Sequence, residues 1–435
     1  MRYAHLLLLS FFFLCCRGSK MNISNTDWIN DQTIYEVNLR QYTSDGTIAS
    51  FRNHLPRLKE MGIGILWFMP IHPIGEINRK GELGSYYSVK DYFSVNPEFG
   101  TAEEFRSLVH EIHGMGMYVI LDWVANHTAC DNELVTTNPD WYTKNENQNF
   151  QPPSGTDWSD VYDLDFGQSG LRGYMTSAME YWVREFDIDG FRCDVAGMVP
   201  SDFWETTIKK LNSIKPIFML AEWEDPELLE KGFNADYNWS LYHILKEIAS
   251  GHKEVSSIRN HFEKPTKSYS SNALKMNFLD NHDENSWNRI MINHFGNKTY
   301  ALSTMLFTLP GIPMIYSGQE SRLSKQLKFF EKDTIRWRTY PDANFYKQLI
   351  GLRKTNPVFW SNNTNIEFLN GYHKDIVGYK RWDSDNIYFI IVNLSDQIQE
   401  LKKELISHDL LIKDERSSGQ SISGGGFIVY KVIND

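Results

Sequence analysis

The chain of 435 residues is poor in cysteine and in basic charge. Two of its four cysteines stand together at Cys15 and Cys16, which leaves Cys130 and Cys193, so a disulfide framework is excluded as the main source of stability. Forty-four Lys and Arg face 55 Asp and Glu, and the formal net charge is −11. A protein that follows nucleic-acid phosphates needs the opposite balance, so we expect no nucleic-acid partner.

Long apolar runs are missing beyond the N-terminus. No segment after residue 20 approaches the about 18 uninterrupted apolar residues of a membrane-spanning helix. The chain is 41% hydrophobic and 23% charged, which is the balance of a folded protein with a large core. Its length predicts two or three domains, or one α/β barrel with insertions.

The first twenty residues have the pattern of an export signal. Arg2 precedes an apolar stretch from Leu6 to Leu14, and this run of about ten residues suits a signal-peptide core and is too short to span a bilayer. Cys15 and Cys16 end the run as in a bacterial lipoprotein, although the residues before them are larger than usual. We predict a signal peptide at 1–20 and an exported protein, periplasmic, cell-surface or secreted. A lipidated cysteine would attach it to a membrane, and cleavage with release is the alternative.

Short apolar runs alternate with amphipathic helical patterns from Thr33 to about Thr355. Continuous apolar strands separated by helices predict parallel strands that are buried on both faces. Seven or eight such units favour a (β/α)8 TIM barrel, with a doubly wound sheet as the alternative. The expected strands are 34–37, 64–68, 117–121, 188–193, 217–221, 276–279 and 313–316, with a weaker eighth at 232–236.

Two segments break this alternation. Residues 128–165 are polar and lack periodicity, which predicts an inserted domain after strand three, and loops of that length are usually functional. After residue 360 the apolar residues follow a period of two, which predicts a C-terminal antiparallel β domain. The expected division is therefore barrel residues 21–127 and 166–360, an inserted domain at 128–165 and a C-terminal β domain at 361–435.

Acidic side chains follow four of the predicted strands. They are Asp122, Asp194, Glu222 and Asp283. In parallel α/β folds the chemistry gathers at the carboxyl ends of the strands. Helix capping or a salt bridge explains any one of these acids, but like charges that converge on one mouth cost free energy and point to a function.

Two of these acids differ in their surroundings. Arg192 and Asp194 are two apart on one strand, so their side chains point the same way, and the cation is expected to lower the pKa of Asp194. That is the state of a nucleophilic carboxylate. Glu222 is flanked by Ala221 and Trp223, and a drier setting would keep it protonated as a proton donor. One anion and one acid on opposite sides of a glycosidic bond are the parts needed for sugar cleavage.

On these residues the sequence resembles glycoside hydrolase family 13, the α-amylase family, whose four best-known motifs appear in order. They are Asp122-x-x-x-Asn126-His127, Gly-Phe-Arg-x-Asp at 190–194, Glu222 after strand five, and Asn281-His282-Asp283. Weaker similarities lie at 64–70, 161–166 and 311–320. The resemblance covers about residues 30–435. It implies a barrel with an inserted domain after strand three and a C-terminal β domain.

The resemblance also implies roles for single residues. Asp194 is similar to the family's nucleophile, Glu222 to its acid/base and Asp283 to the third carboxylate that grips sugar hydroxyls. Residues expected to bind substrate are Tyr87, His127, Arg192, His282, Trp223 and Asp122, which braces Arg192. A purely structural role is the alternative for Asp122, and packing is the alternative for Tyr87 and Trp223.

Two positions depart from the pattern of many α-amylases. Gly197 and Met198 stand where those enzymes carry Lys and His three and four residues after the nucleophile. The outer sugar contacts are therefore absent or made differently. The same histidine helps to build a structural calcium site in those enzymes, so calcium binding through the retained Asn126 stays open. The chemistry itself requires no cofactor.

We therefore predict a retaining α-glucan hydrolase that cleaves α-1,4 bonds by double displacement. Retention requires the carboxyl groups of Asp194 and Glu222 to be about 5–5.5 Å apart. A neopullulanase or cyclomaltodextrinase-like enzyme with transglycosylation is the runner-up. A magnesium-dependent barrel lyase and a sugar-binding protein without turnover are weaker alternatives. Chain-length preference, endo or exo action and oligomeric state are left open.

Overall fold

The computed structural model describes residues 26–433 except 266, 271–272, 338, 402–407 and 419. The predicted export signal at 1–20, with Cys15 and Cys16, lies outside the described residues. No helix among the described residues is long and apolar enough to cross a membrane.

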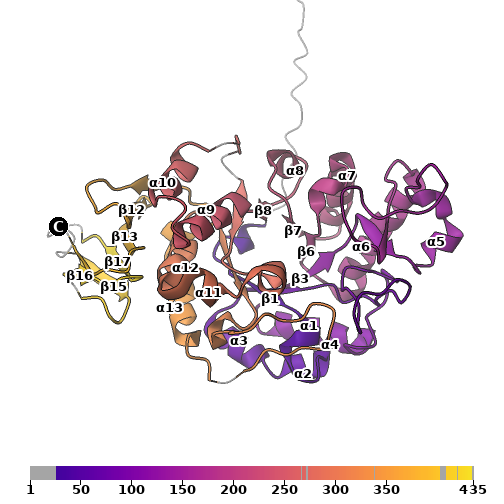
Figure 1. The fold of residues 1–435 in the computed structure, drawn as a ribbon, viewed down its shortest axis with the longest axis horizontal. Coiled ribbons are helices and arrows are strands. Elements are labelled where there is room, and N and C mark those ends of the chain that lie inside the picture. Colours follow the sequence, from indigo (N-terminus) through magenta and orange to yellow (C-terminus); the bar gives the residue numbers. More distant parts are fainter. Residues whose placement is uncertain are drawn as a thin grey trace, which may run out of the picture.

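Eight strands close into a barrel in the order β1-β10-β9-β8-β7-β6-β3-β2, and every neighbouring pair is parallel (Figure 1). They are β1 (Ile34–Val37), β2 (Ile65–Phe68), β3 (Tyr118–Trp123), β6 (Gly190–Cys193), β7 (Phe218–Ala221), β8 (Ala235–Tyr237), β9 (Leu274–Asn277) and β10 (Ile312–Tyr316). Most of their side chains are buried, as expected for strands covered on both faces. The (β/α)8 barrel is confirmed, and the doubly wound alternative is wrong because a closed barrel has no edge strands.

One strand lies earlier than predicted. The expected strand at 276–279 is found as β9 over Leu274–Asn277. Lys275 interrupts the apolar pattern, yet it is part of the strand because its Nζ forms an ion pair with Asp236 of the neighbouring β8 at 2.9 Å. Opposite charges on adjacent strands stabilise the pairing of β8 with β9 at this position, so β9 does not need an apolar residue there.

Helices cover the outside of the barrel. The longer ones are α3 (Leu55–Met61), α4 (Ala102–Gly114), α6 (Ser169–Phe186), α7 (Ser201–Asn212), α9 (Trp239–Ala249), α10 (Ser256–Glu263), α12 (Thr299–Thr308) and α13 (Ala343–Thr355). The shorter ones are α1 (Leu39–Tyr42), α2 (Ile48–Arg52), α5 (Leu134–Thr137), α8 (Pro226–Glu230) and α11 (Met291–Phe295). Helix α4 begins with a capping box, in which the Thr101 side chain accepts from the Glu104 N–H and Glu104 accepts from the Thr101 N–H.

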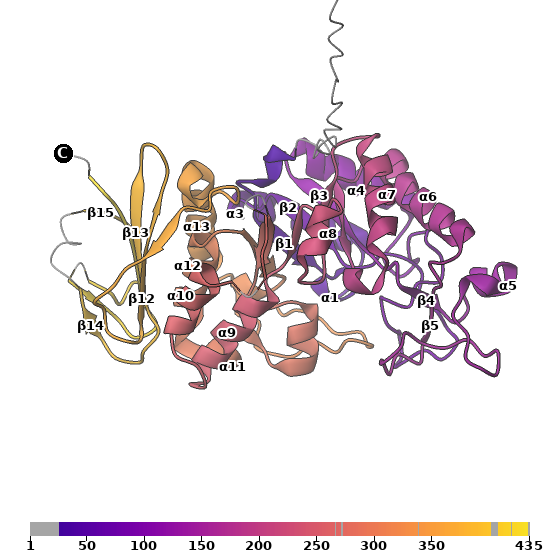
Figure 2. The same ribbon diagram turned by 90° about the horizontal axis from the view of Figure 1, so that it is seen from above.

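Two further units stand at opposite ends of the barrel (Figures 1 and 2). After β3 the chain leaves the barrel and forms the antiparallel pair β4 (His127–Ala129) and β5 (Val161–Asp163). At the other end lies an antiparallel sheet in the order β11-β12-β13-β17-β15, against which α12 packs. Its strands are β11 (Ile366–Phe368), β12 (Ile376–Trp382), β13 (Ile387–Asn393), β15 (Asp409–Lys413) and β17 (Phe427–Lys431), beside the pair β14 (Gln399–Glu400) and β16 (Ser421–Ile422).

Candidate active site

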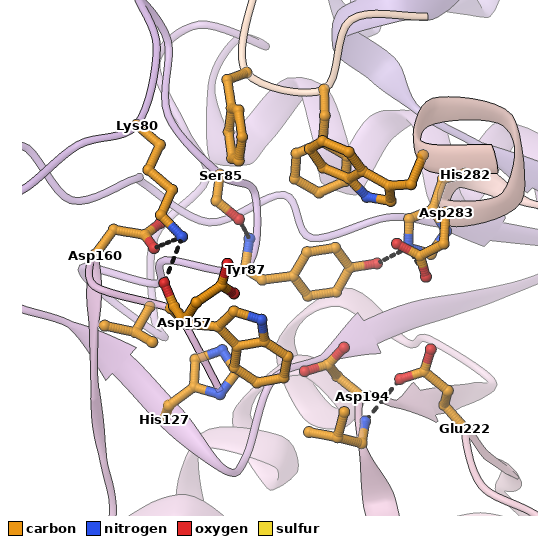
Figure 3. Close-up of a pocket in the computed structure, with 16 residues that line it drawn as sticks. Lys80, Ser85, Tyr87, His127, Asp157, Asp160, Asp194, Glu222, His282 and Asp283 are labelled. Carbon is orange, nitrogen blue, oxygen red and sulfur yellow. Dashed lines mark hydrogen bonds and ion pairs between the residues drawn. The ribbon is translucent and has the colours of Figure 1, made fainter. Parts of the chain in front are cut away.

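A cavity of about 560 Å³ opens at the carboxyl ends of the barrel strands (Figure 3). Asp194 follows β6, Glu222 follows β7 and Asp283 lies beyond β9, so barrel closure brings together acids that are far apart in sequence. Six residues predicted from the sequence line this cavity: Tyr87, His127, Asp194, Glu222, His282 and Asp283.

The Arg192 guanidinium lies beneath the cavity and joins three carboxylates. It is fully buried; its Nη1 donates to Asp122 Oδ1 at 2.8 Å and to Asp194 Oδ1 at 3.1 Å. Its Nη2 lies 2.6 Å from Glu222 Oε1, and its Nε donates to Tyr237. Asp194 is hydrogen-bonded to one terminal nitrogen and Glu222 forms an ion pair with the other, so the guanidinium holds the two carboxyl groups next to each other. Asp122 contacts Arg192, which is the position that the predicted bracing role requires.

The backbone after Asp194 is strained. Val195 has φ 35° and ψ 47°, a left-handed conformation that is rare for a β-branched residue and costs on the order of 1–3 kcal/mol. This conformation directs the Val195 N–H toward Glu222 Oε2, to which it donates at 2.8 Å. The strain therefore serves to fix the Glu222 carboxyl beside Asp194.

The pKa values of the three carboxyl groups around Arg192 are raised, whereas a lowered pKa was expected for Asp194. Burial raises the pKa of Asp194 to about 7, because removal from water outweighs the opposing effect of Arg192. The expected lowering is therefore wrong in sign. Burial also raises the pKa of Glu222 to about 8 and that of Asp122 to about 6. One cation cannot keep three buried carboxyl groups ionised, and Glu222, with the highest pKa, keeps its proton most readily.

A second charge network surrounds His282. Its Nδ1 pairs with Glu36, and its Nε2 lies 3.2 Å from Asp283 Oδ2 and 2.7 Å from the Tyr87 hydroxyl. Burial would lower the pKa of His282, but Asp283 and Glu36 raise it well above its ordinary value. For Asp283 burial alone would raise the pKa, but the neighbouring His282 imidazolium lowers that pKa below its ordinary value. Asp283 is thus an anion, and its side chain is 38% exposed toward the cavity.

His127 and Tyr87 offer neutral contacts to a ligand. Burial lowers the pKa of His127 to about 4, so its imidazole is uncharged near neutral pH. The Tyr87 hydroxyl donates to Asp122 Oδ2 at 3.1 Å, and its ring stacks on Phe329 with the planes 14° apart. Figure 3 shows this ring across the cavity from Asp194 and Glu222.

Four predicted residues do not line this cavity. Arg192 and Asp122 lie behind it, and Trp223 lines a neighbouring hollow. Asn126 is buried, and its amide lies 3.5 Å from Asp163, which also accepts from Thr143.

Asn126 is the residue expected to bind calcium, and its side chain contacts one carboxylate, that of Asp163. Calcium takes about six to eight oxygen ligands. Across the described part of the chain, no group of three or more His, Cys, Asp or Glu residues is arranged to hold a metal. Calcium binding through Asn126 stays a prediction.

Several residues in or next to the cavity were missed from the sequence. Glu36 is a charged residue inside the apolar run of β1, and it forms an ion pair with His282. A charge inside a buried strand could have indicated such a role from the sequence. Phe329, from a turn after β10, and Trp287, from the short π-helix η4 (Glu284–Asn288), have rings 5.2 Å apart and lie outside the four sequence motifs. Lys80, which also lines the cavity, forms an ion pair with Asp160 at 3.2 Å (Figure 3).

Comparison with known proteins agrees with this geometry. A family model described as the alpha amylase catalytic domain matches residues 22–373. Among curated proteins, Alpha-amylase 3 of Dictyoglomus thermophilum is 24% identical in an alignment that covers 85% of this chain and 86% of the relative.

Solved structures are similar over almost the whole chain. An α-amylase from Lactobacillus plantarum superposes with a TM-score of 0.84 at 30% identity, and the match covers 93% of this chain and 99% of that one. A noncanonic maltogenic α-amylase from Thermotoga neapolitana gives a TM-score of 0.79 at 30% identity, covering 93% and 97%.

Proposed function

The chain belongs to the α-amylase family of glycoside hydrolases, family 13, and on that premise we propose that it cleaves α-1,4-glucosidic bonds with retention. The proposed substrates are starch-like polysaccharides and maltooligosaccharides. The similarity to a maltogenic α-amylase supports including the short oligosaccharides.

The first half of the reaction forms a covalent intermediate. The Asp194 carboxylate attacks the anomeric carbon, while Glu222 donates its proton to the leaving glycosidic oxygen. Asp283, His282 and the neutral His127 hold the hydroxyls of the sugar, and Tyr87 covers its face. The C–O bond breaks, and a β-glycosyl ester with Asp194 remains.

The second half returns the enzyme to its starting state. Glu222, now ionised, takes a proton from water, whose oxygen attacks the anomeric carbon from the face that the leaving group vacated. The ester bond breaks, and its electron pair returns to Asp194. Two inversions give net retention.

The shared guanidinium carries this proposal. Arg192 binds Asp194 and Glu222 through its two terminal nitrogens, at 3.1 and 2.6 Å. Such a short bridge supports the about 5–5.5 Å separation of a retaining enzyme over the about 6.5–9.5 Å of an inverting one. The weaker alternatives lack comparable support, because a lyase needs a metal-holding acid cluster and a silent binding protein does not need a strained backbone beside an acid.

The stereochemistry of the first product tests retention. We expect proton NMR of maltooligosaccharide hydrolysis to show the α-anomer first, followed by slow mutarotation to the equilibrium mixture. Chromatography of the products from starch, pullulan and cyclodextrins separates an α-amylase from the cyclomaltodextrinase-like alternative. Initial release of the β-anomer would overturn the double displacement.

The raised pKa values predict a neutral to slightly alkaline optimum. Asp194 must be ionised, so kcat/KM should fall as the pH drops below about 7. Glu222 must be protonated for the first step, so kcat/KM should fall as the pH rises above about 8. A bell-shaped profile of initial rates on soluble starch, with its maximum between these values, is the expected result. An optimum near pH 4 would contradict the electrostatics described here.

Export remains a proposal that rests on residues 1–20 alone. The apolar run from Leu6 to Leu14 and the pair Cys15 and Cys16 support an exported protein held at a membrane by lipid. An extracytoplasmic enzyme of this kind would meet α-glucans outside the cell.

A further inference from the structure

Glu36 is a buried acid outside the set of residues that line the catalytic cavity. It lies in β1, and its side chain has no exposed surface. Successive side chains of a strand point to opposite faces, so Tyr35 faces away from the barrel interior, where its hydroxyl donates to Glu320 at 2.6 Å, and Glu36 faces the interior. A carboxyl group in that setting costs free energy unless it is paired.

His282 is the partner of Glu36. Among the described residues the Glu36 carboxyl binds one side chain: its Oε1 pairs with His282 Nδ1, whereas its Oε2 is buried without a hydrogen-bond donor. On the other side of the ring, His282 Nε2 lies 2.7 Å from the Tyr87 hydroxyl and 3.2 Å from Asp283 Oδ2. The imidazole therefore connects an acid inside the barrel with the cavity.

The contacts of His282 fix where its protons lie. The Tyr87 hydroxyl donates to Asp122, so its oxygen accepts from His282 Nε2–H, and Asp283 is a second acceptor on that side. Nδ1 faces the Glu36 carboxyl and therefore also carries a proton. A ring with an N–H on both sides is an imidazolium.

We propose that Glu36 is a positioning residue for the reaction and acts through His282: it holds the ring as an imidazolium whose Nε2–H points at Asp283 and at a hydroxyl of the bound sugar. The inference rests on the proposed function, because it adds to that site a residue that does not touch substrate. A charged donor forms a hydrogen bond about twice as strong as a neutral one. The cation also keeps Asp283 ionised for its contact with the sugar.

The other titratable groups around this pair do not replace Glu36. Burial raises the pKa of Asp280 well above its ordinary value, and Glu36 and Glu284 add to the shift, so Asp280 is a neutral acid. Burial also raises the pKa of each neighbouring tyrosine, so these are neutral too, and Asp122 already pairs with Arg192. The tyrosines are Tyr87 after β2, Tyr237 of β8 and Tyr316 of β10.

Removal of the charge should give His282 a titration that the wild type does not show. Burial lowers the pKa of His282, and Asp283 and Glu36 together more than offset it. In Glu36→Gln the amide keeps the size of the side chain, but Asp283 then acts alone, so the pKa of His282 falls. Since the ring is protonated below its pKa, the imidazolium is lost at a lower pH than in the wild type.

Cleavage of α-maltosyl fluoride reports this titration. Fluoride leaves without a proton from Glu222, so deprotonation of Glu222 should not limit kcat/KM for this substrate. We expect kcat/KM of the wild type to stay level as the pH rises through the alkaline range, and that of Glu36→Gln to fall. At neutral pH the variant should be about 10- to 100-fold less active, the range for residues that orient a functional histidine.

Two further variants make the result specific. Glu36→Asp keeps the negative charge and should keep the level alkaline profile, even where its shorter side chain lowers the rate. Glu320→Gln neutralises another fully buried glutamate of the barrel, which pairs with Arg57 at 2.7 Å and does not line the cavity. It controls for the loss of a buried ion pair, and its profile should follow that of the wild type.

An alkaline fall in Glu36→Gln that is absent from Glu36→Asp and Glu320→Gln supports the inference. A level profile in Glu36→Gln, or the same fall in all three variants, would overturn it. NMR of the wild type with labelled histidines needs no variant to fold: one ring should stay protonated above the ordinary range, and titration of every ring near the ordinary pKa would also overturn the inference. A wild type that releases neither fluoride nor sugar from starch would instead refute the proposed function.

Discussion

Asp194→Asn is expected to abolish turnover while leaving the fold and sugar binding largely intact. The amide keeps the size of the carboxyl and an oxygen that can accept from Arg192, but it cannot form the ester intermediate. Asp122 and Glu222 still pair with Arg192, so the buried cation is not left alone. We expect kcat on soluble starch to fall by about 10⁴-fold or more.

Two further measurements make this result specific. Thermal unfolding should show a folded variant, and titration with maltooligosaccharides should show binding close to that of the wild type. Asp140→Asn makes the same chemical change on an exposed carboxyl of the segment after β4 and should leave kcat unchanged. Near-normal activity of Asp194→Asn would overturn the assignment of the nucleophile.

Glu222→Gln is expected to produce a loss that depends on the leaving group. The amide cannot donate a proton to the glycosidic oxygen, so hydrolysis of starch should fall by about 10²- to 10⁴-fold. Fluoride leaves without a proton, so the first step on α-maltosyl fluoride should be much less affected. The second step still lacks its base, and azide, a nucleophile that needs none, should restore turnover.

The pH profile gives Glu222→Gln a separate readout. The fall in kcat/KM above pH 8 reports the proton on Glu222, whose pKa burial raises to about 8. In the variant this limb should disappear for α-maltosyl fluoride, while the fall on the acidic side should remain. An equal loss on starch and on the fluoride, without rescue by azide, would assign the proton transfer to another residue.

The sequence allowed the barrel and the acids at its mouth to be predicted because both leave local signals. Parallel strands covered on both faces are short apolar runs, and Asp194 and Glu222 stand out as charges directly after such runs. That they meet on Arg192 follows from barrel closure. Lys275 lies inside β9 without an apolar signal, because its ion pair with Asp236 forms only in the closed barrel.

Burial and loop contacts could not be predicted in the same way. The sign of the Asp194 pKa shift depends on how completely the fold excludes water, whereas the neighbouring Arg192 was visible in the sequence. Phe329, in a turn, and Trp287, in a short π-helix, reach the cavity from segments whose meeting depends on the whole fold. The close approach of Trp223 to Gly197 likewise depends on the whole fold, because the two residues lie in segments that follow different strands, β7 and β6.

The most direct test of the proposed mechanism is to trap the ester. Glu222→Gln mixed with α-maltosyl fluoride should form the intermediate faster than it is hydrolysed, so intact-protein mass spectrometry should show the gain of one maltosyl group. Peptide mapping should place that group on Asp194. A labelled residue other than Asp194, or rapid fluoride release without any covalent sugar, would contradict the account.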